Sequence, residues 1–362
     1  MTQTLSRRGA LPFSTSATAL AAFALAGAAV AAGNPDGHCT VPVAAQPENT
    51  GTPTTVVGTG TPASCTSAAF VAAVAKGGVI TFNCGANPVT ITLKETAKVF
   101  NDRPDVVIDG GNKVTLSGGG ARRILYQNTC DPAQHWTSNR CDIQDNPHLT
   151  VQNLALLLGN SSGQTYGRDD VYGGGAIFVR GGRLKVYNTR FFRNACEPTG
   201  PDLGGAAIRV FQTSPKVPVY ISNSTFGGSQ LNANVCSNGG AVSTLVSSLA
   251  VYNSLFTDNQ AVGNGANPAR PGTPGGGSGG AIYQDGNTFS LRSCGNKVAN
   301  NHANEGGGAF FFVSNDLTGT MTINQSTLVG NVSDGFETQG LPGIFILAKP
   351  GQPVVKDSLI SR

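Results

Sequence analysis

The chain has 362 residues, of which 12% are charged and 49 are glycine, and its formal net charge is +4. Because disordered chains are usually rich in charge, this composition excludes a largely disordered protein and favours a folded, loop-rich one. The basic residues are scattered and form no Lys/Arg run, so nothing points to a nucleic-acid partner.

The first 31 residues have the features of an export signal. Arg7 and Arg8 precede an apolar run from Ala17 to Ala31, in which Ala29-Val30-Ala31 supplies small residues for cleavage. A membrane anchor is the alternative, but the run is short and rich in alanine for a span. The paired arginines also resemble a twin-arginine signal. We therefore expect a mature chain without a membrane span that is secreted, periplasmic or at the cell surface.

All eight cysteines follow this segment, and an even number in an exported protein predicts disulfides. The chain has no Cys-x-x-Cys pair, which argues against a structural zinc site. Sequence distance and position in the repeats described below suggest three pairs, and a fourth remains: Cys65–Cys84, Cys130–Cys141, Cys196–Cys236 and Cys39–Cys294.

The elements that follow change character along the chain. Residues 32–62 are rich in Pro, Thr, Gly and Ala and predict an irregular segment. A helix is predicted at 68–76, with Ser or Thr before it as cap, Gly77 after it, and Phe70, Val71 and Val74 on its apolar face. We expect this helix to close the end of a repeat array. Short β-rich runs follow at 79–82, 89–93, 106–108 and 114–116.

A longer pattern repeats from Leu149 onward. It reads apolar, any, apolar, any, Asn, Ser or Thr, any, Phe, then Asn, a variable loop and Gly-Gly-Ala-Ile. Each repeat holds three short strands and three turns, which fits one coil of a parallel β-solenoid. The asparagine at the turn is expected to bond its equivalent in the next coil, ~4.8 Å away. The expected turn positions are Asn153, Asn188, Asn223, Asn253, Ser293 and Gln325.

This repeat pattern resembles that of right-handed parallel β-helix proteins in the pectate-lyase-like superfamily. It is especially similar to polymorphic outer-membrane-protein repeats. The resemblance covers about residues 64–348. It implies an all-β, single-stranded right-handed parallel β-helix of about eight coils with a short N-terminal capping helix. The expected divisions are a signal peptide at 1–31, an irregular segment at 32–62, the β-helix at 63–350 and a tail at 351–362. The superfamily hosts lyases, hydrolases, epimerases and adhesins, so it specifies fold rather than activity.

The resemblance also implies a substrate groove along the Gly-Gly-Ala-Ile sheet, walled by the variable loops. Side chains alternate along a strand, so the residue after each inward Ile, Val or Phe should face outward. Aromatic rings can stack on sugars and arginine can hold a carboxylate. The alternative is that loops cover this sheet and bury its outer side chains. The expected outward residues are Phe178, Arg209, Ser243, Tyr283 and Phe311. Two positions further along their strands, Arg180 and Asp285 should also face outward.

The resemblance makes Arg209 the candidate catalytic base, because polysaccharide lyases of this superfamily use an Arg or Lys to remove the proton next to a uronate carboxylate. Arginine is normally protonated, so a substrate clamp or a surface ion pair is the alternative. Asp169 and Asp170 precede the glycines of one repeat and are candidate catalytic acids. Together with Asp202 they are also candidate calcium ligands, the alternative being a solvated polar loop.

The predicted function is binding of an extended, acidic polysaccharide or cell-surface glycan by a monomeric secreted protein, with cleavage by a lyase or hydrolase as an option. The chain lacks the Gly-His-Gly, Arg-Ile-Lys and Asn-Thr-Asp motifs of related enzymes, which weakens a catalytic role. The alternative function is a non-catalytic secreted or cell-surface adhesin, or a structural β-helix protein.

Overall fold

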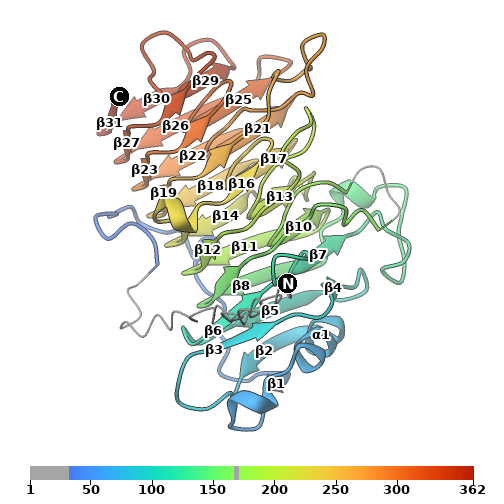
Figure 1. The fold of residues 1–362 in the computed structure, drawn as a ribbon. Coiled ribbons are helices and arrows are strands. Elements are labelled where there is room, and N and C mark those ends of the chain that lie inside the picture. The colour runs from blue at the N-terminus through green and yellow to red at the C-terminus, as the bar shows by residue number, and fades with distance from the viewer. Residues whose placement is uncertain (1–31, 167–170) are drawn as a thin grey trace, which may run out of the picture. The chain divides into compact units, whose positions relative to one another are not determined.

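The computed structural model describes residues 32–166 and 171–362. The expected signal peptide and the candidates Asp169 and Asp170 lie outside these ranges. The described part is mostly β-structure in four sheets, here A to D, within which neighbouring strands are parallel (Figure 1). Its one α-helix is α1 (Ser67–Lys76). The described chain is thus an all-β parallel solenoid, in agreement with the fold class expected at this level.

The strands of sheet A are β1 (Thr55–Val57), β2 (Gly78–Phe82), β5 (Asp105–Asp109), β8 (His148–Gln152), β11 (Arg183–Tyr187), β14 (Val219–Ser222), β18 (Leu249–Tyr252), β22 (Ser290–Cys294), β26 (Thr320–Asn324) and β30 (Val354–Lys356). Those of sheet B are β3 (Val89–Thr92), β6 (Val114–Ser117), β9 (Ala155–Leu157), β12 (Arg190–Phe192), β15 (Thr225–Gly227), β19 (Leu255–Thr257), β23 (Lys297–Ala299), β27 (Thr327–Val329) and β31 (Leu359–Ser361).

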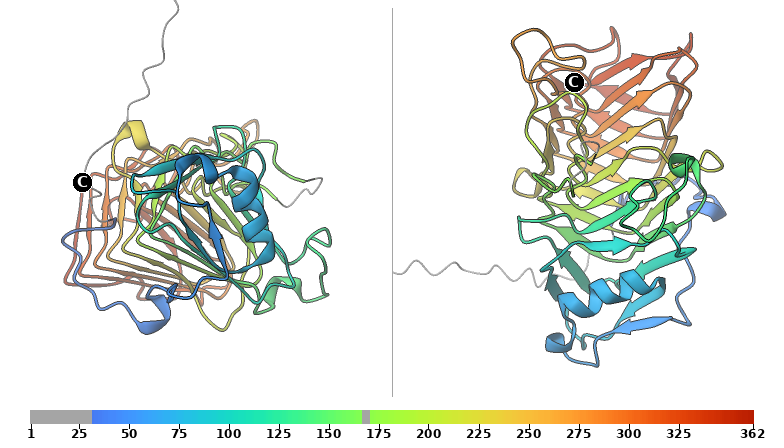
Figure 2. Two further views of the ribbon diagram at one scale, coloured as in Figure 1. Left: turned by 90° about the horizontal axis from the view of Figure 1, so that it is seen from below. Right: turned by 90° about the vertical axis from the view of Figure 1, so that its right-hand side faces the viewer.

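Sheet C contains β4 (Ala97–Val99), β7 (Leu125–Asn128), β10 (Ile177–Arg180), β13 (Ile208–Val210), β17 (Val242–Leu245), β21 (Ile282–Gly286), β25 (Phe310–Ser314) and β29 (Ile344–Leu347). Sheet D contains β16 (Val235–Cys236), β20 (Gln260–Ala261), β24 (His302–Ala303) and β28 (Val332–Ser333). Short 3-10 turns are η1 (Val43–Ala45), η2 (Pro62–Ser64), η3 (Cys141–Ile143) and η4 (Gln230–Asn232). Each coil adds one strand to each sheet it crosses, so equivalent residues stack along the solenoid (Figure 2).

The interior is filled by identical positions of successive coils. The rings of Phe191, Phe226 and Phe256 stack with centroids 4.5 Å apart at both steps and with nearly parallel planes. All three side chains are fully buried. Offset contact between aromatic faces adds to the burial of their area, so this column is a main source of stability.

The buried asparagine ladder lies at a different position from the one expected. Among the expected turn residues, a side-chain bond joins Asn188 to Asn153 at 2.8 Å, and these turns lie at the edge of the core. The continuous ladder, named here the inner asparagine ladder, comes from the last asparagine of each repeat. Its side-chain amides link from coil to coil at 2.8–2.9 Å in the order Asn194, Asn234, Asn259, Asn301 and Asn331.

One expected register is wrong by two residues. Ser293 pairs with Val251 inside β22, so the residue equivalent to Asn253 is Gly295 rather than Ser293. Both Asn253 and Gly295 have a positive φ, of 48° and 69°. The turn selects residues that tolerate the left-handed region, which Asn and Gly do. Val298 therefore stacks on Phe256.

Helix α1 forms where the sequence predicts it. The Thr66 hydroxyl oxygen accepts a hydrogen bond from the Ala69 N–H at 3.2 Å, and Gly77 ends the helix with a φ of 78°. Phe70 and Val74 are fully buried in the main core. Figure 2 shows α1 at the end of the stack formed by the first strands, where it covers their interior. The capping role expected for this helix fits that placement.

All four expected disulfides form: Cys39–Cys294, Cys65–Cys84, Cys130–Cys141 and Cys196–Cys236. Such bonds persist in oxidising compartments, which fits an extracellular or secreted protein. The described helices are all too short or too polar to span a bilayer.

The segment 32–50, named here the strap, is anchored against the solenoid. Asn34 donates its N–H to the Asn253 carbonyl at 2.9 Å, and the Cys39 disulfide follows. Further along, Glu48 and the side chain of Gln152 exchange two hydrogen bonds, of 2.8 and 3.0 Å. The strap thus crosses several coils along the outer side of sheet A (Figure 1).

The expected tail is part of the solenoid. Residues 354–356 form β30, which pairs with β26, and 359–361 form β31, which pairs with β27. The boundary placed at residue 350 is therefore wrong, because both strands extend the sheets of the preceding coils.

Candidate functional site

The outward row on sheet C has the expected register but not the expected exposure. Phe178, Arg209, Ser243, Tyr283 and Phe311 are paired in that order across neighbouring strands. Their exposed fractions are 0%, 2%, 0%, 1% and 4%. The expectation that these five side chains line an open groove is therefore wrong, and the alternative of a second core under loops is correct.

Loops between the repeats supply the cover. The Asn267 side chain donates to the Tyr283 hydroxyl at 3.1 Å and to Asp202 at 3.0 Å. The Tyr283 and Phe311 rings stack at 4.7 Å. Phe336, from a later loop, meets Phe311 edge-on at 6.4 Å. Burial of these aromatic faces offsets the cost of ordering long glycine-rich loops.

Arg209 is held as a structural cation. Its guanidinium donates to the Ser243 hydroxyl and to the Asp202 carbonyl, and within the described chain its Nε has no hydrogen-bond partner. Burial lowers the pKa of Arg209 to about 10, which leaves it protonated at neutral pH. A covered and protonated guanidinium is a poor base, so the expected catalytic role has no support from this geometry.

The two remaining candidates on sheet C are partly exposed. Arg180 donates to Asp142 at 2.6 Å and lies over the Phe211 ring at 4.6 Å. Asp285 accepts hydrogen bonds from the Tyr283 hydroxyl at 3.0 Å and from Asn315 at 3.1 Å. Both side chains already have protein partners, which reduces what they offer to a ligand.

Of the three candidate calcium ligands, only Asp202 lies within the described residues. Asp202 accepts from Asn267, and its proposed companions Asp169 and Asp170 lie outside the described residues. Within the described ranges, one group has three metal-type side chains in reach of one another: Cys130, Cys141 and Asp142. Its two sulfurs form a disulfide and offer no thiolate.

An open cavity lies instead between the strap and the outer face of sheet A. Its volume is about 410 Å³. The strap side is formed by residues 43–48, including Gln46 and Glu48, and the sheet side includes His148, Lys185 and Tyr220. We call it the strap cavity. His148, Lys185 and Tyr220 point outward from sheet A, because they alternate along their strands with the buried Leu149, Leu184 and Val219.

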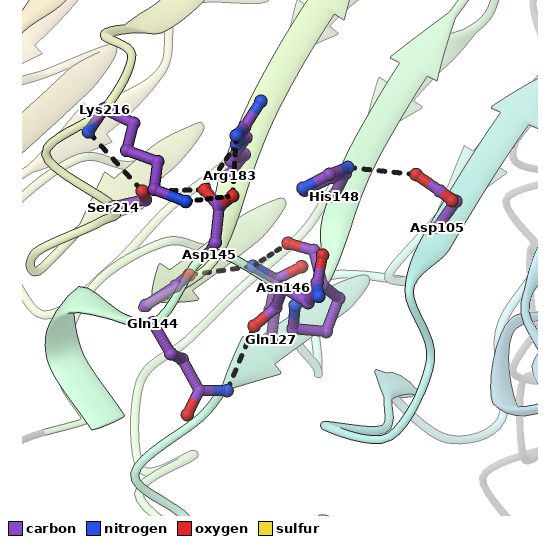
Figure 3. Close-up of polar contacts among 11 residues, drawn as sticks. Asp105, Gln127, Gln144, Asp145, Asn146, His148, Arg183, Ser214 and Lys216 are labelled. Atoms are coloured by element: carbon purple, nitrogen blue, oxygen red, sulfur yellow. Dashed lines mark hydrogen bonds and ion pairs between the residues drawn. The ribbon is translucent and has the colours of Figure 1, made fainter. Parts of the chain in front are cut away.

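A row of paired charges borders this cavity (Figure 3). Arg183 binds Asp145 through two hydrogen bonds of 2.7 Å, and Lys216 approaches the same carboxylate at 3.0 Å. His148 Nδ1 lies 3.0 Å from Asp105. A bidentate Arg–carboxylate pair fixes the orientation of both groups, so Arg183 is held at the cavity edge.

Two further side chains define the row. The Nε2 atom of His148 is buried and has no hydrogen-bond partner among the described residues, and Asp105 orients the opposite ring nitrogen. Lys185 forms an ion pair with Glu48, which links the sheet to the strap. Of the residues lining the cavity, Arg183 and Lys185 are cationic and Glu48 is anionic, and the bordering carboxylates of Asp145 and Asp105 pair with Arg183 and His148.

Comparison with protein-family models, with curated proteins and with solved structures gives no match. The assignment of a function therefore rests on the geometry of the described residues.

Sequence reasoning missed the strap cavity. Alternation along residues 183–187 and 219–222 places Lys185 and Tyr220 outward by the same rule that was applied to sheet C. The position of the strap was the missing information, because it depends on a disulfide between residues 255 positions apart.

The Asp145 cluster predicts a pH effect. Hydrogen bonds from Arg183, Ser214 and Lys216 lower the pKa of Asp145 well below its usual range. A lowered carboxyl pKa stabilises the folded chain above the unfolded-state pKa of about 4, and this contribution is lost as the pH falls. We expect Asp145→Asn to lower the free energy of unfolding by about 1 kcal/mol at pH 7. Urea denaturation should show this difference shrinking steadily below about pH 4; a difference that is constant with pH would contradict the assignment.

Proposed function

We propose that this chain is an exported right-handed parallel β-helix, of the type found in the pectate-lyase-like superfamily, that binds an extended acidic polysaccharide. The parallel sheets, the stacked Phe191, Phe226 and Phe256 rings and the inner asparagine ladder support the fold assignment. Binding is assigned to the strap cavity rather than to sheet C, because the expected residues of sheet C are covered.

The observation that carries this function is the open strap cavity with its basic and aromatic lining. Tyr220 is half-buried and can present a ring face to a sugar. Arg183 uses Nε and Nη2 to bind Asp145, which leaves the Nη1 donors without a partner in the described chain for a ligand carboxylate. A linear chain with repeated carboxylates and hydroxyls matches these side chains along one sheet face. Calcium remains part of the proposal as an ion bridging ligand carboxylates to the protein.

The test is binding of purified mature protein to polygalacturonate, alginate and hyaluronan by calorimetry, with and without calcium. Tyr220→Ala is expected to weaken binding by about fivefold, since it removes an aromatic contact of roughly 1 kcal/mol. Trp136→Ala is the matched control, because Trp136 is an exposed aromatic outside the cavity. Equal binding by wild type and Tyr220→Ala, or loss in Trp136→Ala alone, would place the site elsewhere.

The same samples test cleavage. A lyase would produce unsaturated sugars, which absorb in the ultraviolet. We propose binding without cleavage, because the candidate base Arg209 is covered and protonated. Absorbance that rises with time and is retained in Arg209→Gln would reveal a lyase with a different base.

The second candidate function is a non-catalytic adhesin or structural protein. The observation that favours it is the closed outer face of sheet C, where loops bury the aromatic row. Absence of binding to any glycan in the test, together with a folded protein, would support this alternative.

A further inference from the structure

A second open cavity lies where the chain passes from sheet B to sheet D. Its volume is about 440 Å³. We call it the corner cavity. Its lining comes from four segments: Gln230, then Asp258 and Gln260, then Asn300, Asn301 and His302, and finally Gly330 and Val332.

The coil geometry holds this lining in register. Gln260 pairs with His302 across β20 and β24, and His302 pairs with Val332 across β24 and β28. Asp258 and Asn300 each precede a member of the inner asparagine ladder and have φ values of 62° and 56°. The ladder directly behind the cavity therefore fixes its floor.

The lining offers unused hydrogen-bonding groups. The side-chain amides of Gln230, Gln260 and Asn300 make no hydrogen bond within the described chain. Each amide has both donors and an acceptor, which is what neighbouring sugar hydroxyls require. His302 is oriented by Asp334, whose carboxylate lies 2.8 Å from its Nε2.

Charge and apolar contacts define the ligand class further. The lining contains a carboxylate, Asp258, and no Lys or Arg, which disfavours an anionic ligand. Burial raises the pKa of Asp258, as expected for a carboxyl group away from bulk water. Val332, in the lining, and Leu231, next to Gln230 in η4, are exposed at 48% and 87%. Such side chains can pack against the apolar C–H face of a sugar ring.

We propose that the corner cavity is a binding site for an uncharged saccharide. It does not depend on the acidic polysaccharide proposed for the strap cavity, because the two cavities share no residue and differ in charge.

The experiment uses the mature protein and a panel of neutral oligosaccharides of glucose, mannose, galactose and N-acetylglucosamine, with oligogalacturonate as the anionic comparison. Affinity is measured by calorimetry, and the site by amide chemical-shift changes. At least one neutral sugar is expected to bind saturably and to shift the amides of residues 258–260 and 300–302. Gln260→Ala should weaken it about fivefold, the effect of one lost hydrogen bond. Gln46→Ala, the same change in the strap cavity, should leave it unaltered.

Three results would overturn the proposal. The first is no shift of these amides by any neutral sugar at roughly 10 mM, a concentration that detects even millimolar affinity. The second is an equal loss in Gln46→Ala and Gln260→Ala. The third is tighter binding of oligogalacturonate than of neutral sugars at these amides. Failure here with retained Tyr220-dependent binding of acidic chains would leave the strap-cavity function intact.

Discussion

Replacing Phe226 with alanine is expected to lower the free energy of unfolding by about 3–5 kcal/mol. Phe226 lies between the rings of Phe191 and Phe256 and is fully buried. The substitution would remove two ring contacts and leave a cavity in the middle of a rigid stack, where neighbouring coils cannot move inward without breaking strand pairs.

Urea denaturation of the disulfide-intact protein measures this change. Leu231→Ala is the control, since Leu231 is 87% exposed and its loss should change stability by less than about 0.5 kcal/mol. An equal, small effect of both substitutions would mean that Phe226 does not belong to a packed column.

Replacing Asn259 with alanine is expected to lower the free energy of unfolding by about 2–4 kcal/mol, because several buried polar groups lose their partners together. Its amide donates to Asn301 at 2.9 Å and to the Phe226 carbonyl at 3.0 Å, and its oxygen accepts from Asn234 at 2.8 Å. Each of these groups is buried, so water cannot replace the lost bonds.

The matched control is Asn287→Ala, at an exposed position outside the ladder. Hydrogen exchange should show faster opening at the amides of Asn234 and Asn301 in the Asn259 variant, and no change in the control. If the two variants have the same urea midpoint, the ladder contributes far less than its geometry indicates.

The solenoid could be predicted because its determinants are local and repeated. The alternation after Gly-Gly-Ala correctly puts Ile208 and Ile282 inward and Arg209 and Tyr283 on the opposite face. The turn after β22 was misplaced because Gly295 replaces the asparagine there, and both residues meet the same backbone requirement.

The site could not be predicted from alternation alone. An outward residue is exposed only where no loop covers it, and the loop that carries Asn267 covers Tyr283 through long-range contacts. The strap is tied to sheet A by the Cys39–Cys294 disulfide. That pair was expected only because these two cysteines remained after the other three pairs had been assigned. Strand direction follows from local pattern, whereas exposure depends on distant segments.

Replacing one arginine on sheet A and one on sheet C tests most directly whether the acidic polysaccharide binds in the strap cavity. Arg183 borders the strap cavity and Arg209 lies in the expected groove of sheet C, so Arg183→Gln and Arg209→Gln form a matched pair. Both variants are first checked for native circular dichroism, and their affinities for the same acidic polysaccharide are then measured by calorimetry. Binding in the strap cavity predicts that Arg183→Gln weakens the complex by about tenfold, the loss of one charge-assisted contact, while Arg209→Gln binds as wild type does. The reverse result would contradict it and return the site to sheet C.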